Sequence, residues 1–262
     1  PTRRSSDLGD DKMLKKERLI AIQKAVDEKG IVNVNDLIEA LDVSDMTIRR
    51  DLDELAKSGK IHRIHGGAQR VENIEDVELT RNEKTIVNSE LKEQVANKAA
   101  NLIVPGDTLY LGPGTTIEPL IKYVEHPEQI RVVTNSLPVF EAWKQTDAEI
   151  VLIGGNFRKK SGAFIGGLAE QMLRELKFTK AFVSANGIND ECVMTANAEE
   201  GQTQAVALNN AQKKIMMLDE TKFNRNDFYR YYNLYNIDCI VTSNGLSDST
   251  FKHYSSYVEI KK

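Results

Sequence analysis

The feature that most constrains the fold is an alternation of short apolar strands with amphipathic helices over the last two thirds of the chain. Six apolar runs have the length of buried strands, at 108–111, 130–134, 150–153, 181–184, 215–218 and 239–242. Amphipathic stretches lie between them, at 116–124, 137–144, 168–176 and 200–211. Such an alternation is typical of a mainly parallel sheet covered on both faces. The sequence therefore predicts an α/β domain over residues 91–262.

Residues 13–70 carry a different pattern, in which three short helices precede a basic ribbon. Helical periodicity over 14–29 ends at Gly30, and a second helix, for which Asn35 is the expected cap, follows a short extended link. Ser44 precedes a third helix, and its hydroxyl can accept the free backbone N–H groups of the first turn. One apolar stripe of this third helix is expected to face inward and consists of Ile48, Leu52 and Leu55.

The ribbon that follows alternates apolar and basic residues over 60–64, as a strand does, and Gly66-Gly67 closes it. The stretch from Lys57 to Arg70 contains four Lys or Arg residues and no acidic one. A capped helix with arginines on its outer face, followed by a basic ribbon, suits insertion into a DNA groove with a wing on the neighbouring backbone. The sequence predicts a winged helix-turn-helix over residues 13–70 and a linker over 71–90.

The outer face of the third helix supplies the candidate DNA contacts. Arg50 can grip a guanine edge with two hydrogen bonds, and Thr47 or Met46 can touch a thymine methyl group. Asp45 and Asp51 are expected to orient arginines or caps, since a carboxylate that faces a phosphate is repelled. Phosphate contacts, which position the protein without reading sequence, are expected from Ser44, Arg49, Lys57, Lys60, Arg63 and His65, with Gly66 and Gly67 in the wing. The structural alternative is a solvated charged helix face.

The net charge of −4 is unusual for a DNA-binding protein until it is resolved along the chain. Residues 13–70 hold eleven basic and ten acidic residues, a net charge of +1, whereas residues 71–262 carry −5. The local field, not the global charge, governs the encounter with phosphate. The acidic remainder favours a protein that discriminates against random DNA.

Several classes of protein and site are excluded by the sequence. No apolar stretch approaches the roughly 20 residues that a membrane-spanning helix needs, and no secretory signal pattern is present, so a cytoplasmic protein is expected. Cys192 and Cys239 are isolated and predict reduced thiols. The four histidines have no metal-ligand spacing, and no catalytic or nucleotide-binding motif occurs, so no cofactor and no metal are expected. Residues 1–12 are expected to be a disordered leader or an expression remnant.

Polar or glycine-rich turns follow five of the six predicted strands. Open parallel sheets bind small molecules at the carboxyl ends of their strands, so a converging site is expected there. Lys222 and the loop at Gly112 suit a phosphate, while Asn135, Asn186 and Asp219 suit sugar hydroxyls. The candidate ligand-binding residues are Gly112, Gly114, Thr115, Thr116, Asn135, Ser136, Gly154, Gly155, Asn186, Gly187, Asp219 and Lys222.

Taken together, these residues resemble the DeoR family of bacterial transcriptional regulators. The stretch Val43–Leu52 with His65-Gly66-Gly67-Ala68 looks like that family's DNA-binding signature. The resemblance implies a distal sensor domain that shares its fold with ribose-phosphate isomerase and CoA transferases and binds a phosphorylated sugar. The matching positions of that domain are 106–108, 114–116, 134–136, 154–155, 185–188 and 221–222.

Three positions narrow the resemblance to one branch of the family. Pro113 replaces the small polar residue of the commonest loop, and residues 193–195 also depart from the commonest form. Together with residues 163–166, these positions resemble the lactose phosphotransferase-system repressor branch. That branch implies tagatose 6-phosphate as the effector.

Two functional hypotheses from different classes follow. The first is a repressor of a sugar operon that binds operator DNA as a homo-oligomer, a dimer or a tetramer, and is released by a phosphorylated sugar. The second is a sugar-phosphate isomerase with a DNA-binding tether, which needs a carboxylate base; Asp219, Glu199 and Glu200 are its candidates. A structural DNA-coating protein conflicts with the acidic bulk of the chain.

Overall fold

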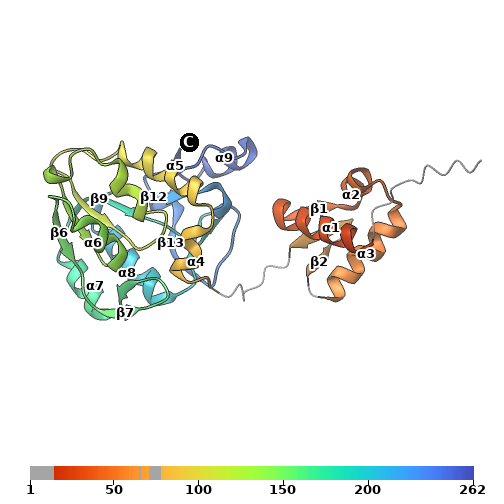
Figure 1. Cartoon of the computed structure of the whole chain (residues 1–262), viewed down its shortest axis with the longest axis horizontal. Coiled ribbons are helices and arrows are strands. Elements are labelled where there is room, and N and C mark those ends of the chain that lie inside the picture. The colour runs from red at the N-terminus through yellow and green to blue at the C-terminus, as the bar shows by residue number, and fades with distance from the viewer. Residues whose placement is uncertain (1–14, 59, 65, 71–77) are drawn as a thin grey trace, which may run out of the picture. The chain divides into compact units, whose positions relative to one another are not determined.

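The computed structural model describes residues 15–58, 60–64, 66–70 and 78–262 (Figure 1). The chain divides into two compact units, Pro1–Asn73 and Ile74–Lys262. No helix in the described ranges is both long and apolar enough to span a bilayer.

The first unit consists of three helices and a small antiparallel sheet. The helices are α1 (Lys15–Lys29), α2 (Val34–Leu41) and α3 (Asp45–Lys57), and the strands are β1 (Ile31–Asn33), β2 (Ile61–Ile64) and β3 (Gly67–Arg70), in the order β1-β3-β2. Ile48, Leu52 and Leu55 of α3 are buried in its core, which confirms the predicted inward stripe. The predicted wing is confirmed as the β2–β3 hairpin, and β1 adds a third strand to it.

The prediction that Asn35 caps the second helix was wrong. The helix begins at Val34, and its cap position is occupied by Asn33, two residues before Asn35, without a side-chain cap bond. The buried Val34 side chain belongs to the core, and its backbone N–H donates to the Gly66 carbonyl at 2.9 Å. The contact with the wing therefore decides where α2 starts, and a local cap signal does not.

The second unit is built on a seven-stranded parallel sheet in the order β15-β14-β12-β9-β4-β5-β6. The six predicted strands are confirmed, and an edge strand at the C-terminus adds a seventh. The strands are β4 (Thr108–Leu111), β5 (Arg131–Thr134), β6 (Glu149–Leu152), β9 (Phe178–Val183), β12 (Ala211–Leu218), β14 (Cys239–Thr242) and β15 (Glu259–Lys261).

Helices cover both faces of this sheet. Alternate strand residues point to opposite faces, so each face has its own apolar core. Tyr110 packs into the core with α7 (Gly167–Arg174), α8 (Ala198–Asn209) and α9 (Asp248–Tyr254). Its neighbours Leu109 and Leu111 pack into the opposite core with α5 (Ser89–Ala100) and α6 (Leu137–Trp143). Figure 1 shows this second unit in yellow to blue. The two-layered coverage confirms the predicted α/β fold.

The helix expected over 116–124 is a six-residue 3-10 helix, η1 (Glu118–Tyr123). Its backbone bonds run from residue i to i+3, as in Leu120 N–H to the Ile117 carbonyl at 3.0 Å. Pro119 lies in the first turn of this helix, where its missing N–H costs no helical hydrogen bond. The remaining short 3-10 helices are η2 (Pro127–Gln129), η3 (Glu220–Lys222) and η4 (Leu234–Asn236).

Two small antiparallel sheets and one further helix complete the second unit. The strands β7 (Asn156–Arg158) and β8 (Ala163–Ile165) form a hairpin, and β10 (Gly187–Asn189), β11 (Cys192–Thr195) and β13 (Tyr229–Asn233) form a three-stranded sheet. The helix α4 (Arg81–Ile86) lies within the stretch expected to be a linker and begins with a capping box, in which Thr80 and Glu83 bond reciprocally. These elements carry charged residues to the edge described below.

Candidate functional site

The first candidate site is the outer face of α3. Ser44 caps the helix as predicted, because its Oγ accepts the Thr47 N–H at 3.3 Å, and the two hydroxyls lie 2.9 Å apart. Met46 is 81% exposed although it is apolar, and Arg50 is exposed beside it. Within the described ranges Arg50 has no hydrogen-bond or ion-pair partner. Its guanidinium is therefore available to an external acceptor.

The other predicted arginine contacts are already engaged inside the unit. Arg49 donates through Nε to both carboxylate oxygens of Asp45, at 2.9 and 2.8 Å, so Asp45 orients an arginine as expected. Arg63 lies 3.0 Å from the Asp53 carboxylate and donates to the Gly67 carbonyl at 2.7 Å. Both side chains would have to share or leave these acceptors to reach a phosphate.

The remaining predicted contacts lie at the end of α3 and in the segment that leads into and forms the wing. Lys57 and Lys60 are exposed, as is Gly66, which has a positive φ of 79°. Gly67 is buried, and a Cβ on it would lie 2.1 Å from the Val32 carbonyl oxygen. Its structural role is thus the close pairing of β3 with β1. His65 lies outside the described residues.

The second candidate site is the carboxyl edge of the parallel sheet. The strands β12, β9, β4, β5 and β6 are consecutive neighbours and run parallel. The five turns predicted to form a site therefore leave the sheet along the same edge, which is where open α/β sheets bind ligands.

The glycine-rich turn after β4 approaches its neighbours closely. Gly112 donates its N–H to the Phe182 carbonyl at 2.9 Å, and a Cβ on Gly112 would lie 3.4 Å from Oε1 of Gln204. That Oε1 is buried and has no partner among the described residues. Gly114 has φ 144°, a conformation that favours glycine. Thr115 is half-buried and Thr116 is buried within the turn.

Some predicted ligand residues are instead bonded inside the fold. Asn135 is fully buried: its Oδ1 accepts from the Tyr110 hydroxyl at 2.8 Å, and its Nδ2 donates to the Phe164 carbonyl at 2.8 Å. Ser136 is buried and caps α6 through the Val139 N–H. Gly155 adopts φ 154°, and a Cβ there would lie 2.8 Å from the Ile165 carbonyl, whereas Gly154 has open space. Asn135, Ser136 and Gly155 therefore fix the conformation of these turns.

Lys222 is half-buried just after β12, near the opposite charge of Asp219. Burial lowers the pKa of Lys222 to about 8; Asp219 opposes this shift, and the neighbouring cations Arg225, Lys84 and Lys92 add to it. Asp219 is fully buried, and its Oδ1 accepts the Thr221 N–H at 3.0 Å. Below about pH 8 this lysine is protonated, and together with the neighbouring cations it makes this edge suitable for an anionic ligand.

Two lysines bring further cations to this edge. Lys84 lies in the stretch expected to be a linker, and Lys92 lies just after that stretch. Nζ of Lys84 donates to Oδ1 of Asn186 at 3.3 Å, which engages a predicted ligand residue. Lys92 is buried, its Nζ donates to the Val87 carbonyl at 2.7 Å, and burial lowers its pKa. Gly187 is buried against the Arg225 backbone.

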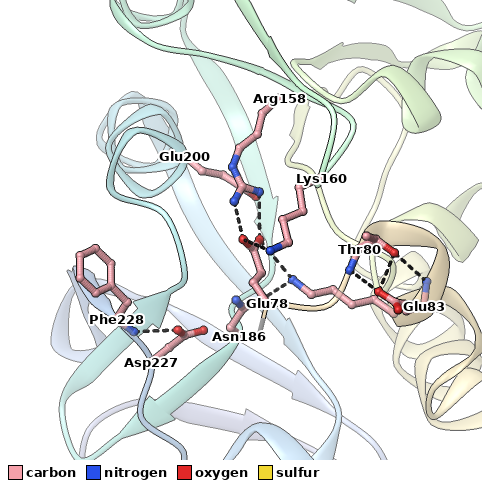
Figure 2. A network of polar contacts seen from close by, with 10 residues as sticks. Glu78, Thr80, Glu83, Arg158, Lys160, Asn186, Glu200, Asp227 and Phe228 are labelled. Carbon is pink, nitrogen blue, oxygen red and sulfur yellow. Dashed lines mark hydrogen bonds and ion pairs between the residues drawn. The ribbon is translucent and has the colours of Figure 1, made fainter. Parts of the chain in front are cut away.

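A second group of charges surrounds Glu78 (Figure 2). Arg158 donates to both oxygens of Glu78, with Nη1 to Oε1 at 2.9 Å, and its Nη1 also lies 3.3 Å from Glu200. Lys84 and Lys160 lie 3.8 and 3.6 Å from the Glu78 carboxylate. Burial alone would raise the pKa of Glu78, but Arg158 and the two lysines outweigh it and lower that pKa. Burial raises the pKa of Glu200.

Sequence reasoning missed this group because its members are far apart in the chain. Two local signals point to it: the capping box at Thr80 and Glu83 indicates a helix in the expected linker, and a basic run over 158–160 follows Gly154-Gly155. No group of three or more His, Cys, Asp or Glu side chains suited to a metal ion occurs among the described residues.

Comparisons with known proteins match both units. Residues 18–73 match the DeoR-like helix-turn-helix domain, and residues 87–244 match the DeoR C-terminal sensor domain. The lactose phosphotransferase system repressor of Lactococcus lactis subsp. lactis is 41% identical over 253 residues, 95% of this chain and 99% of that protein. The repressor of that name from Staphylococcus epidermidis is 38% identical over 251 residues, with the same two shares.

Among solved structures, ribose 5-phosphate isomerase A from Neisseria gonorrhoeae matches with a TM-score of 0.40 and 17% identity. The match covers 53% of this chain and 55% of that chain.

Proposed function

We propose that this chain, which belongs to the DeoR family of transcriptional regulators, represses a lactose- or galactose-utilisation operon. It leaves its operator when a phosphorylated sugar binds. Tagatose 6-phosphate is the effector we favour. The observation that carries the proposal is the convergence of five strand-end turns on one edge that also holds Lys222 and Lys84. The first unit, with its capped helix α3 and its exposed Arg50, supplies the DNA-binding output.

We assign the DNA contacts by exposure. Arg50, Met46 and Thr47 lie at the start of α3 and are the candidates for base contacts, whereas Lys57 and Lys60 are exposed and suit phosphates. Ser44, Arg49, Arg63, His65, Gly66 and Gly67 remain proposed backbone contacts or supports. A homo-oligomer, a dimer or a tetramer, would match a palindromic operator.

We assign the ligand contacts in the same way. Lys222, Gly112, Gly114 and Thr115 are the proposed phosphate contacts, and Asn186 is the proposed hydroxyl contact. Asn135, Ser136, Thr116, Gly155 and Asp219 are buried or internally bonded, and we propose that they shape the edge around Gly154 and Gly187.

The test measures operator binding and effector binding on the same protein. A duplex is selected from a random library by the purified protein, and its affinity is measured with and without tagatose 6-phosphate. We expect weaker DNA binding with the sugar phosphate, and weaker sugar-phosphate binding with the DNA by the same factor, because linkage is reciprocal. Equal affinity for tagatose 6-phosphate with and without the duplex would contradict the proposal.

The isomerase alternative is tested by turnover. The curated relatives are named repressors, and two of the three candidate bases are engaged: Glu200 lies against Arg158, and Oδ1 of Asp219 accepts from Thr221. We therefore infer a regulator, and we expect purified protein not to interconvert ribose 5-phosphate or tagatose 6-phosphate with their isomers. Measurable turnover would support the alternative.

A further inference from the structure

The carboxylate of Glu78 occupies a site built from cations. Arg158 holds both of its oxygens, Lys160 approaches from the turn that follows Arg158, and Lys84 approaches from α4 (Figure 2). The side chains of Glu78 and Arg158 are 13% and 16% exposed, so the pair is largely withdrawn from solvent. Three cations around one carboxylate, with Glu200 as the only other acid facing Arg158 among the described residues, leave the group electropositive.

We propose that Glu78 is an internal competitor in the effector site: it occupies the part of the phosphate subsite that Arg158, Lys84 and Lys160 form, and the phosphorylated sugar displaces it. The arginine fork binds carboxylate and phosphate with the same bidentate geometry. A phosphate monoester carries about two negative charges and three acceptor oxygens, so it is the stronger ligand for three cations. Lys84 also contacts Asn186, so a ligand seated there would reach the proposed hydroxyl contact.

Displacement has a mechanical consequence because of where Glu78 lies in the chain. It is the first described residue of the second unit, next to the stretch that joins the two units. The next anchors along the chain are Thr80, whose N–H donates to Oε2 of Glu83 at 2.7 Å, and Arg81, whose N–H donates to the Lys160 carbonyl at 2.8 Å. Loss of the Glu78 contact alone therefore frees about two residues, roughly 7 Å of extended chain. Effector binding would thus lengthen the connection to the DNA-binding unit.

This inference rests on the proposed function, and it predicts the effect of removing the competitor. A ligand that must displace a tethered group binds with an affinity reduced by the fraction of molecules in which the site is open. Glu78→Gln keeps the shape of the side chain and removes its charge. Glu90→Gln removes the same charge from the exposed first turn of α5 and is the matched control.

The experiment titrates the full chain with tagatose 6-phosphate, and with inorganic phosphate as a probe of the cations alone. We expect Glu78→Gln to bind both at least about fivefold more tightly than the wild type, and Glu90→Gln to stay within about twofold. Half-maximal release from the selected duplex should need less tagatose 6-phosphate by the same factor. In the wild type, hydrogen exchange of a peptide that contains Glu78 should speed up when the sugar phosphate is bound.

The outcomes separate the inference from the proposed function. If tagatose 6-phosphate releases the wild type from DNA but Glu78→Gln binds it no more tightly, the competitor role is overturned and the repressor proposal stands. Unchanged exchange of the Glu78 peptide at saturation also overturns the role, and this measurement does not depend on the folding of any variant. If neither protein binds the sugar phosphate and DNA is not released, the effector proposal and this inference both fail.

Discussion

Arg18 of α1 donates through Nε to Oδ2 of Asp51 in α3 at 2.5 Å, and both side chains are buried. This ion pair joins the first helix to the helix that we propose reads DNA. Asp51 had been expected to orient an arginine or a cap, and it orients an arginine of a different helix. The orientation of α3 in the first unit therefore depends on a contact between residues 33 positions apart.

Asp51→Ala should destabilise the first unit. The substitution leaves the Arg18 guanidinium buried without this carboxylate, and removal of one partner of a buried ion pair typically costs about 3–5 kcal/mol. We expect a loss at the lower end of that range, measured by urea unfolding followed by circular dichroism. Asp53→Ala, on an exposed position of the same helix, is the control and should change stability far less. Equal losses for both variants would contradict the role of the pair.

Arg50→Ala should relax sequence preference at one base pair. A bidentate contact to a guanine edge contributes about 1–3 kcal/mol of discrimination, which binding to single-substituted duplexes measures. Lys60→Ala is the contrasting variant, because loss of a phosphate contact weakens binding to all duplexes alike and lowers the salt dependence by about one ion. An unchanged preference at every position in Arg50→Ala would remove Arg50 from the base-reading set.

Sugar-phosphate affinity should fall as pH rises through about 8. Burial lowers the pKa of Lys222 to about 8, so the free protein loses this positive charge above that pH. Lys222→Met should bind tagatose 6-phosphate more weakly at pH 7 and should lose this pH dependence, which calorimetry at pH 7 and pH 9 tests. A variant that retained the wild-type pH profile would show that another group titrates.

The same shift predicts how folding stability depends on pH. Between pH 8 and the ordinary lysine pKa of 10.5, Lys222 is neutral in the folded protein and protonated in the unfolded chain. The unfolded state then binds more protons, so the Lys222 contribution to stability rises with pH across this window. Lys222→Met should flatten that rise in thermal unfolding of the unliganded protein. A rise of equal slope in both proteins would assign it elsewhere.

Gly67→Ala should disrupt the wing. A Cβ at this position would lie 2.1 Å from the Val32 carbonyl oxygen, so β1 and β3 must part to accommodate it. We expect a loss of several kcal/mol in the stability of the first unit, as is typical when backbone pairing is broken or strained. Gly167→Ala, where nothing lies within 4 Å, should be nearly neutral. Wild-type stability of Gly67→Ala would mean that the two strands can separate at little cost.

Much of the fold could be predicted because its signals are local. Ser44 is recognisable as a cap from the residues that follow it, and the stripe of Ile48, Leu52 and Leu55 identifies a buried face. Six strands were predicted from short apolar runs, since a strand buried on both faces needs apolar residues throughout. Where a local signal competed with a distant contact, the contact decided: Val34 begins α2 because it binds Gly66.

The sequence by itself determined that two units exist, that the second is a parallel α/β sheet, and that polar turns follow its strands. Only the tertiary structure decided which side chains meet there. It bonded Asn135 inside the fold, brought Lys84 from a stretch that reads as a linker, and set Glu78 between Arg158 and Lys160. The physical reason is that helix and strand periodicity is a property of neighbouring residues. The pairing of buried charges depends instead on which strands and turns become neighbours in the sheet, and these are distant in sequence.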